Sequence, residues 1–297
     1  MGAILSPRRR PPPFARLAAA AALALAWAGA AAAQEPAVPP PSPPKVAIPN
    51  YWDPKRRPER PSLGELTRIR FVTENDYPPF NFLASDGTLV GFNVELARAI
   101  CVELKLECTI QPRDWDSLIP SLKSGDADAV IAGIAITARA RREVDFSDRY
   151  LQNPARFVAR NGAALDPSAD LLAGKHVGVV GGTSHEQFLR GQFRDAAITT
   201  FPSVEEARRA LTSGELDAVF ADGVGLGIWL NGEEANGCCR FVGGPYTESF
   251  YFGEGIAIAL RQGNDTLRHA INYALAQLYE RGVYAELYLR YFPISFY

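Results

Sequence analysis

LKSGDADAVIAG (122–133) and LTSGELDAVFAD (211–222) are two stretches of equal length that share seven residues at matching positions. Each predicts the end of a helix, a Ser-Gly stop, an acidic step and a buried strand. Helix–glycine–strand steps also arise by chance, but seven identities favour a true internal repeat. Because 89 residues separate the copies, which is too far for a solenoid period, the repeat predicts two similar α/β lobes.

Strand and helix signals alternate on both sides of the repeat. Expected strands cover 69–73, 108–111, 129–134, 157–159, 176–180, 198–201, 218–221 and 255–259, with a hairpin over 81–92. Expected helices cover 94–104, 117–123, 137–143, 186–193, 204–212, 265–281 and 284–291. This alternation predicts parallel sheets with helices on their faces. Ligands of such sheets bind at the carboxyl ends of strands, so Gly133 and Asp222, at equivalent strand ends, are expected to face a shared cleft.

The first 65 residues differ from the rest in composition. Residues 1–33 combine arginines, a short Ala/Leu run and Ala31-x-Ala33, which are the three parts of a secretory signal peptide. A membrane anchor is disfavoured because the run is alanine-rich and short. We therefore expect cleavage near Ala33 and a periplasmic location. Residues 34–65 contain ten of the 23 prolines and predict a proline-rich disordered linker.

The charge balance argues against a nucleic-acid partner. The chain has 31 basic and 33 acidic side chains; without the four arginines of residues 1–33, 27 basic side chains remain against 33 acidic ones, a net charge of −6. Proteins that bind phosphate backbones by counterion release need the opposite sign. We therefore expect no nucleic acid among the partners.

The expected export bears on the state of the four cysteines. An oxidising compartment favours disulfides, and neither pair has the C-x2-C spacing or nearby histidine of a zinc site. Three pairings are possible. We expect Cys101–Cys108, across a helix end and the next strand, and leave Cys238 and Cys239 open, since a bond between them would join adjacent residues. No metal and no cofactor are expected.

Residues that could carry catalysis are sparse. The run from 179 to 184 leads from a strand through two glycines into a helix, whose free N–H groups at Thr183 and Ser184 favour an anion. A tight turn with a helix cap explains the run equally well. Ser184, His185 and Glu186 resemble a catalytic triad only in order, because consecutive residues at a helix start point apart. The residues therefore favour a binding protein over an enzyme.

Further stretches of the chain carry a family resemblance. These are IRFVTENDYPPF (69–80), GFNVELA (91–97), WDSLIPSL (115–122), 128–137, VDFSD (144–148) and the C-terminal pattern from 282 to 292. Over residues 68–293 the chain resembles the periplasmic solute-binding proteins of the polar amino-acid class, family 3, the soluble receptors of ABC importers. The spacing of Cys101 and Cys108 is similar to the disulfide of the lysine/arginine/ornithine- and histidine-binding members.

The resemblance implies a type II periplasmic binding protein fold, with two α/β lobes, a hinge of two crossings and a ligand cleft between the lobes. Lobe 1 is expected to be discontinuous, and lobe 2 continuous; the expected bounds are 66–154 with 253–297 for lobe 1, and 155–252 for lobe 2. The hinge crossings are expected near 153–156 and 252–255. The resemblance further implies a monomer that closes around an amino acid or related amine and delivers it to an inner-membrane ABC permease.

The resemblance also implies ligand-binding positions. The aromatic platforms of the family fall on Tyr77 and Trp115, and the aspartate for the ligand amino group falls on Asp222. The anion-binding helix start falls on Thr183 and Ser184. Glu74 stands where binders of basic amino acids place an acid for the ligand side chain.

One position departs from the family pattern. The arginine that clamps the ligand α-carboxylate aligns with Ala140, and Gly133 and Ala135 on the preceding strand offer only backbone groups. Two hypotheses stay open. In one, two acids favour a cationic amine and helix-start N–H groups hold any carboxylate. In the other, Arg139 or Arg141 replaces the missing clamp, although one residue along a helix is a rotation of about 100°.

Two other functions are weighed against the importer. A sensor or accessory protein that binds a ligand without serving an importer is favoured by the long proline-rich spacer. A periplasmic enzyme similar to cyclohexadienyl dehydratase shares the fold, but needs a carboxylate clamp that Ala140 removes. We expect no enzymatic activity.

Overall fold

The computed structural model describes residues 46, 48–49, 51, 55, 58–168 and 170–292. The expected signal peptide, its cleavage site, most of the proline-rich linker and residues 293–297 lie outside the described residues. In the described ranges, no helix has the length and apolar character needed to cross a bilayer. Val46 and Leu63, which belong to the expected linker segment, pack against the core of the first lobe.

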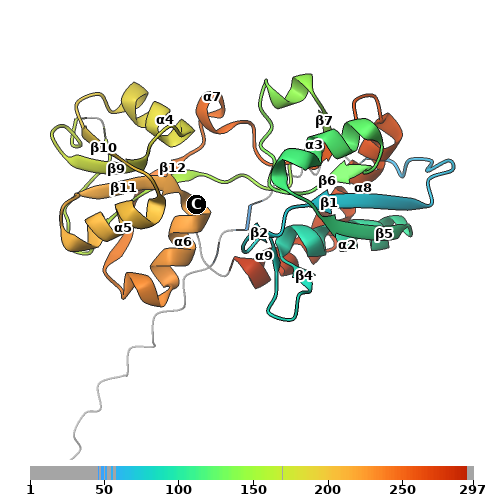
Figure 1. Cartoon of the computed structure of the whole chain (residues 1–297), viewed down its shortest axis with the longest axis horizontal. Helices are drawn as coiled ribbons and strands as arrows, with labels where there is room; N and C mark the ends of the chain where they lie inside the picture. The colour runs from blue at the N-terminus through green and yellow to red at the C-terminus, as the bar shows by residue number, and fades with distance from the viewer. Residues whose placement is uncertain are drawn as a thin grey trace, which may run out of the picture. The chain divides into compact units, whose positions relative to one another are not determined.

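Two α/β lobes, each built around a five-stranded sheet, make up the described chain (Figure 1). The first sheet has β1 parallel to both its neighbours, β5 and β6, while β13 runs antiparallel between β6 and β7. In sheet order its strands are β5 (Glu107–Pro112), β1 (Arg68–Thr73), β6 (Ala129–Val130), β13 (Ala259–Leu260) and β7 (Asp145–Phe146). The chain thus leaves this sheet after β7 and returns to its middle as β13.

Alternation along β1 explains why helices cover both faces of this sheet. Ile69 and Phe71 point to one side and join the core formed with α2 (Phe92–Leu104), whereas Val72 points to the other and packs with α3 (Trp115–Ser124). The two C-terminal helices, α8 (Asp265–Glu280) and α9 (Val283–Tyr291), join α2 on the first side. Burial on both faces is what parallel strands with crossover helices require.

The second sheet has the same plan. Strands β10, β9 and β11 are parallel, and β8 runs antiparallel to β11 and β12. In sheet order these are β10 (Ala197–Phe201), β9 (His176–Val180), β11 (Ala218–Asp222), β8 (Ala155–Arg160) and β12 (Cys239–Tyr246). Helix α4 (Ser184–Gln192) packs with Phe157 and Phe220 on one face, and α5 (Val204–Ser213) packs with Val158 and Val219 on the other. The remaining helices are α6 (Gly223–Asn231), η3 (Glu233–Ala235) and α7 (Ser249–Phe252).

The twelve-residue repeat has equivalent structures in both lobes. Gly125 ends α3 with φ 82°, and Gly214 ends α5 with φ 93°, a left-handed conformation that favours glycine. The shared aspartates also have one role. Asp128 accepts a hydrogen bond from the backbone N–H of Arg70, within the neighbouring parallel strand β1, at 2.9 Å. Asp217 accepts one from that of His176, at the start of the neighbouring parallel strand β9, at 2.9 Å.

The disulfide expected between Cys101 and Cys108 is confirmed; it links the end of α2 to β5. The pairing left open is a disulfide between the adjacent Cys238 and Cys239, at the start of β12. Each pair includes a cysteine of an edge strand, β5 in the first sheet and β12 in the second.

Two local expectations need adjustment. The hairpin expected over 81–92 belongs to a small three-stranded sheet of β2 (Asp76–Tyr77), β3 (Asn81–Leu83) and β4 (Leu89–Val90). The helix expected over 137–143 is wrong, because only the short 3-10 helix η2 (Ala140–Arg142) forms there. The chain straightens at once afterwards, since β7 must pair with β13.

Candidate functional site

A pocket of about 180 Å³ lies at the carboxyl end of β11. Five of the predicted site residues line it: Tyr77, Gly133, Ala135, Ser184 and Asp222. Six residues that the sequence did not single out as ligand contacts complete it: Gln152, Asn153, His185, Phe252, Gly255 and Ile256. The shared cleft expected for the two repeat strand ends is therefore present, with Gly133 and Asp222 in one pocket.

Asp222 is the acidic group of this pocket. It ends β11 and caps α6, where its Oδ1 accepts a hydrogen bond from the backbone N–H of Gly225 at 2.6 Å. Its Oδ2 accepts a hydrogen bond from the side-chain amide of Asn153. Burial raises the pKa of Asp222 to about 6, against the lowering effect of these hydrogen bonds. The carboxylate is consequently charged at pH 7, and its desolvation favours a cationic ligand.

Tyr77 and Gly133 fit together on the other side of the pocket. Gly133 has φ +76°, and a Cβ placed on it would lie 3.2 Å from Cε1 of Tyr77. The glycine therefore allows the ring to lie close to the backbone. Tyr77 also stacks on Phe80 with ring centroids 4.8 Å apart. Burial, helped by the nearby Asp222 and Glu74 carboxylates, raises the pKa of the Tyr77 hydroxyl, which stays neutral and able to donate a hydrogen bond.

Some of the backbone N–H groups at the start of α4 already donate to side chains of the same helix and its cap. Thr183 caps the helix, accepting from the backbone N–H of Glu186 at 3.3 Å and donating to the carbonyl of Val180 at 2.7 Å. The carboxylate of Glu186 in turn accepts from the backbone N–H of Gly182 at 2.7 Å. Ser184, the first helical residue, lines the pocket, whereas the Thr183 side chain is committed to the cap.

His185 is a pocket residue that sequence reasoning placed only at a helix start. Its ring lies 5.2 Å from that of Phe252 and 5.7 Å from that of Phe220. Burial lowers the pKa of His185 to about 4, so the imidazole is neutral at pH 7. It presents an uncharged aromatic wall. The signal that could have found it is its position directly after the glycine turn that leads into α4.

Gln152, Asn153, Phe252 and Gly255 lie at or next to the two segments expected to cross between lobes. Sequence reasoning treated those segments only as hinges. Their distance in sequence, about one hundred residues, conceals that both reach the same pocket. The antiparallel bridges of Ile256 with Ala135 and with Leu151 bring them there.

Three predicted site residues lie elsewhere on the first lobe. Trp115 and Arg139 line a separate pocket of about 160 Å³, together with Thr137 and Ala140. Trp115 is 52% exposed at the start of α3. Glu74 follows β1 and is partly buried; burial raises its pKa, as does the neighbouring Asp76 carboxylate.

The two arginines beside Ala140 differ in their surroundings. Arg141 forms an ion pair with Glu254 at 2.7 Å. Arg139 is exposed, and its guanidinium forms no ion pair with any residue in the described ranges. Of the two candidates for the missing clamp, Arg139 is therefore the one whose side chain is available.

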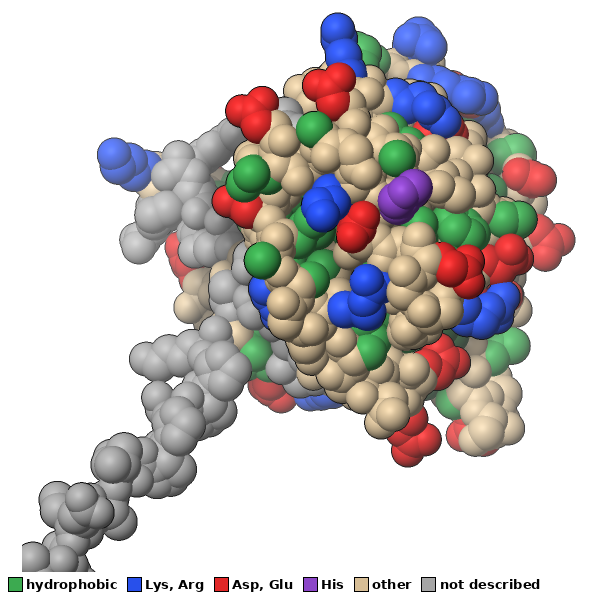
Figure 2. Space-filling model, turned by 90° about the vertical axis from the view of Figure 1, so that its left-hand side faces the viewer, with side chains coloured by type: hydrophobic (Ala, Val, Ile, Leu, Met, Phe, Trp, Pro, Cys, Tyr) green, Lys and Arg blue, Asp and Glu red, His purple; other side chains and the backbone are tan. Residues whose placement is uncertain are grey.

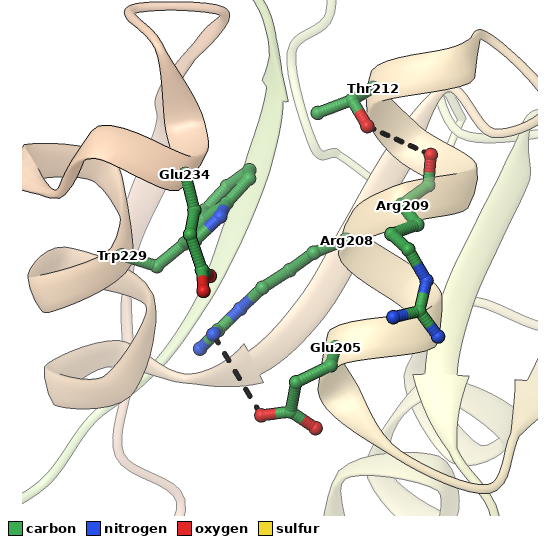
Figure 3. A pocket seen from close by; sticks show the side chains of 6 residues that line it. All are labelled: Glu205, Arg208, Arg209, Thr212, Trp229 and Glu234. Carbon is green, nitrogen blue, oxygen red and sulfur yellow. Dashed lines mark hydrogen bonds and ion pairs between the residues drawn. The ribbon is translucent and has the colours of Figure 1, made fainter.

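A third hollow, of about 330 Å³, lies on the second lobe between α5 and α6 (Figure 3). Its central side chain is Arg208, whose guanidinium lies over the Trp229 ring at 5.4 Å and is 4.0 Å from Glu205. Arg208 also donates to the carbonyl of Gly225 at 3.1 Å. It thereby holds Gly225, whose N–H donates to Asp222, in the first turn of α6.

The exposed face of the second lobe carries mixed charges. Figure 2 shows Lys and Arg side chains interspersed with Asp and Glu, and no continuous basic stripe on the face that it presents. Nor do any three His, Cys, Asp or Glu side chains gather as metal ligands within the described ranges.

Comparison with known proteins places this pocket in context. The family model for bacterial extracellular solute-binding proteins, family 3, matches residues 69–294. The chain is 38% identical to the L-arginine-binding protein of Pseudomonas aeruginosa, over 80% of this chain and 92% of that protein. It is 31% identical to the lysine/arginine/ornithine-binding periplasmic protein of Escherichia coli, over 77% of this chain and 89% of that protein. These relatives are binding proteins.

Solved structures give the same fold. An ancestral arginine-binding protein bound to arginine is 36% identical, with a TM-score of 0.55 over 76% of this chain and 98% of that one. An ancestral cationic amino acid solute-binding protein is 30% identical, with a TM-score of 0.64 over 76% of this chain and 96% of that one. The expected type II binding-protein fold is confirmed.

Proposed function

Because this chain belongs to the bacterial extracellular solute-binding proteins of family 3, we propose that it is the periplasmic substrate-binding component of an ABC importer for a cationic amino acid. One observation carries the choice of ligand charge. Asp222 is a partly buried carboxylate in the pocket, and within the described ranges no Lys or Arg forms an ion pair with it. An uncompensated buried charge is costly, so a cation is the ligand that relieves it.

In this proposal Asp222 binds the α-ammonium group of the ligand. Glu74, whose carboxylate influences Tyr77, receives the cationic end of the side chain. The Tyr77 ring flanks the aliphatic part, and Trp115, which lines a separate first-lobe pocket in this structure, joins it when the lobes close. Gly133 and Ala135 contribute backbone groups. The names of the relatives support a basic ligand, since several bind arginine, lysine or ornithine. Two acids at opposite ends of the site select for a ligand with two positive charges.

The α-carboxylate has two candidate partners. One is the start of α4, where Ser184 lines the pocket and helix N–H groups favour an anion, with Thr183 holding the turn. The other is Arg139, which lines the adjacent first-lobe pocket and has no ion pair in the described ranges. We favour Arg139 as the stronger partner, since guanidinium–carboxylate pairs are bidentate and charge-assisted, whereas Glu186 already occupies the N–H of Gly182.

Residues 66–154 with 253–297 form the first lobe in this proposal, and 155–252 form the second. The crossings near 153–156 and 252–255 act as the hinge about which the lobes close on the ligand. The exported monomer, cleaved near Ala33, then presents the closed form to an inner-membrane permease.

A thermal-shift panel on the exported protein, stripped of ligand by unfolding and refolding, tests this function. The panel contains basic, neutral and acidic amino acids, polyamines and prephenate, the substrate class of the competing dehydratase. A ligand at one hundred times its dissociation constant adds about 2.7 kcal/mol to stability. Only cationic amino acids are expected to stabilise the protein. Stabilisation by neutral or acidic amino acids alone contradicts the choice of ligand.

The matched control is Asp222→Asn, which keeps the helix cap and removes the charge. It should abolish the shift with arginine or lysine while the protein still unfolds cooperatively. Pull-down of permease components with the ligand-loaded protein distinguishes the importer from a sensor; a ligand-loaded protein that captures none favours the sensor.

A further inference from the structure

Asn153 contacts Asp222, and the function proposed above gives its side chain no part in ligand binding. It precedes β8, in the first segment that connects the two sheets, and it lines the pocket. Its side-chain Nδ2 donates a hydrogen bond to Oδ2 of Asp222, and its Oδ1 accepts one from the backbone N–H of Val224 at 3.4 Å. Both ends of the Asn153 amide therefore contact the turn that begins α6.

The backbone ties the same two segments together. The N–H of Gly223 donates to the carbonyl of Pro154 at 2.8 Å, and Ala155 is paired with Asp222 in the register of β8 and β11. A Cβ at Gly223 would lie 2.6 Å from the oxygen of Pro154, which explains why glycine follows Asp222. A displacement of the connecting segment therefore displaces the Asp222 turn with it.

The hydrogen bonds of Asp222 leave capacity for a ligand. A carboxylate offers about four acceptor positions on its two oxygens. The backbone N–H of Gly225 uses one on Oδ1, at 2.6 Å, and Asn153 uses one on Oδ2. The backbone N–H of Val224 also interacts with the carboxylate. Donors on both oxygens keep the carboxylate plane from rotating freely. The unused acceptor positions remain for a donor in the pocket that Asp222 lines.

We propose that Asn153 is a positioning residue for amine binding, which holds the Asp222 carboxylate in one orientation and joins it to the segment connecting the two lobes. This inference rests on the proposed function, because it takes Asp222 as the partner of the ligand ammonium. Asn153 acts through its hydrogen bond to Asp222. Because it belongs to the connecting segment, ligand binding at Asp222 also restrains the position of that segment.

Other titratable or charged groups lie near Asp222 or near the side chains that line its pocket. Arg208 of α5 lies behind the first turn of α6 and lowers the pKa of Asp222 less than its hydrogen bonds do. Tyr77 and His185 line the pocket, and both are neutral between pH 5.5 and 8.5 because burial raises the first pKa and lowers the second to about 4. Glu74, whose pKa burial also raises, lies near Tyr77 and needs a control.

The first experiment compares two ligands by calorimetry on the full exported protein. L-arginine has the α-ammonium group, and 5-guanidinopentanoate is the same molecule without it. Asn153→Leu keeps the branched side-chain skeleton and removes the amide. It should weaken the binding of L-arginine by about 10-fold to 100-fold, the range of a hydrogen bond to a charged group. Binding of 5-guanidinopentanoate should change less than threefold. Asn161→Leu is the matched control, since its amide donates to Gly237 at the other end of β8, and should leave both affinities unchanged.

The second experiment follows L-arginine affinity between pH 5.5 and 8.5. The wild-type affinity falls as the pH drops towards about 6, where Asp222 takes up a proton. Asn153 donates to the ionised form, so its removal should move this fall to higher pH, by half a unit or more. The Glu74→Gln background should show the same displacement. A purely structural role of Asn153 lowers affinity at every pH without moving the midpoint.

The inference is overturned if Asn153→Leu weakens both ligands equally and leaves the pH midpoint in place. Asn153→Ala takes over the same tests if the leucine variant does not fold. A wild-type protein that binds no cationic amino acid refutes the proposed function instead. In that case the carboxyl ¹³C shift of Asp222 in the ligand-free protein decides about Asn153, because its titration midpoint must still rise in the variant.

Discussion

Asp222→Asn should make the ligand-free protein more stable at pH 8 and abolish binding of cationic amino acids. Burial raises the pKa of Asp222 to about 6, from about 3.9 in an unfolded chain. A difference of about two units corresponds to about 3 kcal/mol. The raised pKa means that the folded protein binds the proton more tightly than the unfolded chain. Stability is thus lost as the pH rises from about 4 to about 6, and the loss is complete above that.

Asparagine has no charge to desolvate, and its Oδ1 can still accept from the N–H of Gly225. The variant places an NH2 donor where Oδ2 of Asp222 accepted from the Asn153 amide, so that hydrogen bond is lost, which costs about 1 kcal/mol. The net gain at pH 8 is therefore about 2 kcal/mol, and it should disappear near pH 4, where Asp222 is protonated in the wild type. Sites that bind charged ligands often carry such a stability cost.

Urea unfolding of wild type and variant at pH 4 and pH 8, without ligand, measures this difference. Equal slopes with denaturant concentration show that the unfolded states are comparable. A variant that is less stable at pH 8, or equally more stable at both pH values, refutes the assignment of an uncompensated carboxylate at this position. Tyr273→Phe, on α8 of the first lobe, is a control that should show no such pH dependence.

Three other substitutions test the fold that positions the site. Gly133→Ala adds a Cβ 3.2 Å from the Tyr77 ring at φ +76° and should cost about 1–2 kcal/mol in thermal unfolding; an unchanged Tm would mean that the ring is not seated there. Replacing Cys101 and Cys108 together by serine opens a loop of about eight residues and should lower the free energy of unfolding in urea by about 2.5 kcal/mol. A difference in Tm between wild type and variant that is no larger under oxidising than under reducing conditions would argue against the bond. Phe157→Ala removes a fully buried ring of the second lobe and should cost about 3–5 kcal/mol by calorimetry; a loss below 1 kcal/mol contradicts the packing of β8 against α4.

The local elements were predictable because their signals are local. The repeated Ser-Gly steps ended helices where left-handed glycines occur, at Gly125 and Gly214. The hydrogen bonds of Asp128 and Asp217 to neighbouring strands explain why the repeat keeps that aspartate. The expected export to an oxidising compartment predicted disulfides, and Cys101 could be paired because its partner lies seven residues away.

Membership of the pocket was only partly predictable. Asp222 and the glycine opposite it could be placed because strand ends in such sheets meet ligands. Asn153 and Phe252 were missed as pocket residues, since nothing in their neighbouring residues marks them as ligand contacts. His185 was missed although it follows the glycine turn into α4. Trp115 was assigned by resemblance and lies in a different pocket.

The sequence by itself determined the two α/β lobes, the family and the acid at the end of β11, because periodicity, turn residues and spacing act over a few residues. Only the tertiary structure decided which side chains share the pocket. The reason is physical: Ile256 reaches Ala135 and Leu151 through strand pairing across more than one hundred residues of chain. Such a contact forms only when the chain returns to the first lobe after building the second, and no local pattern specifies it.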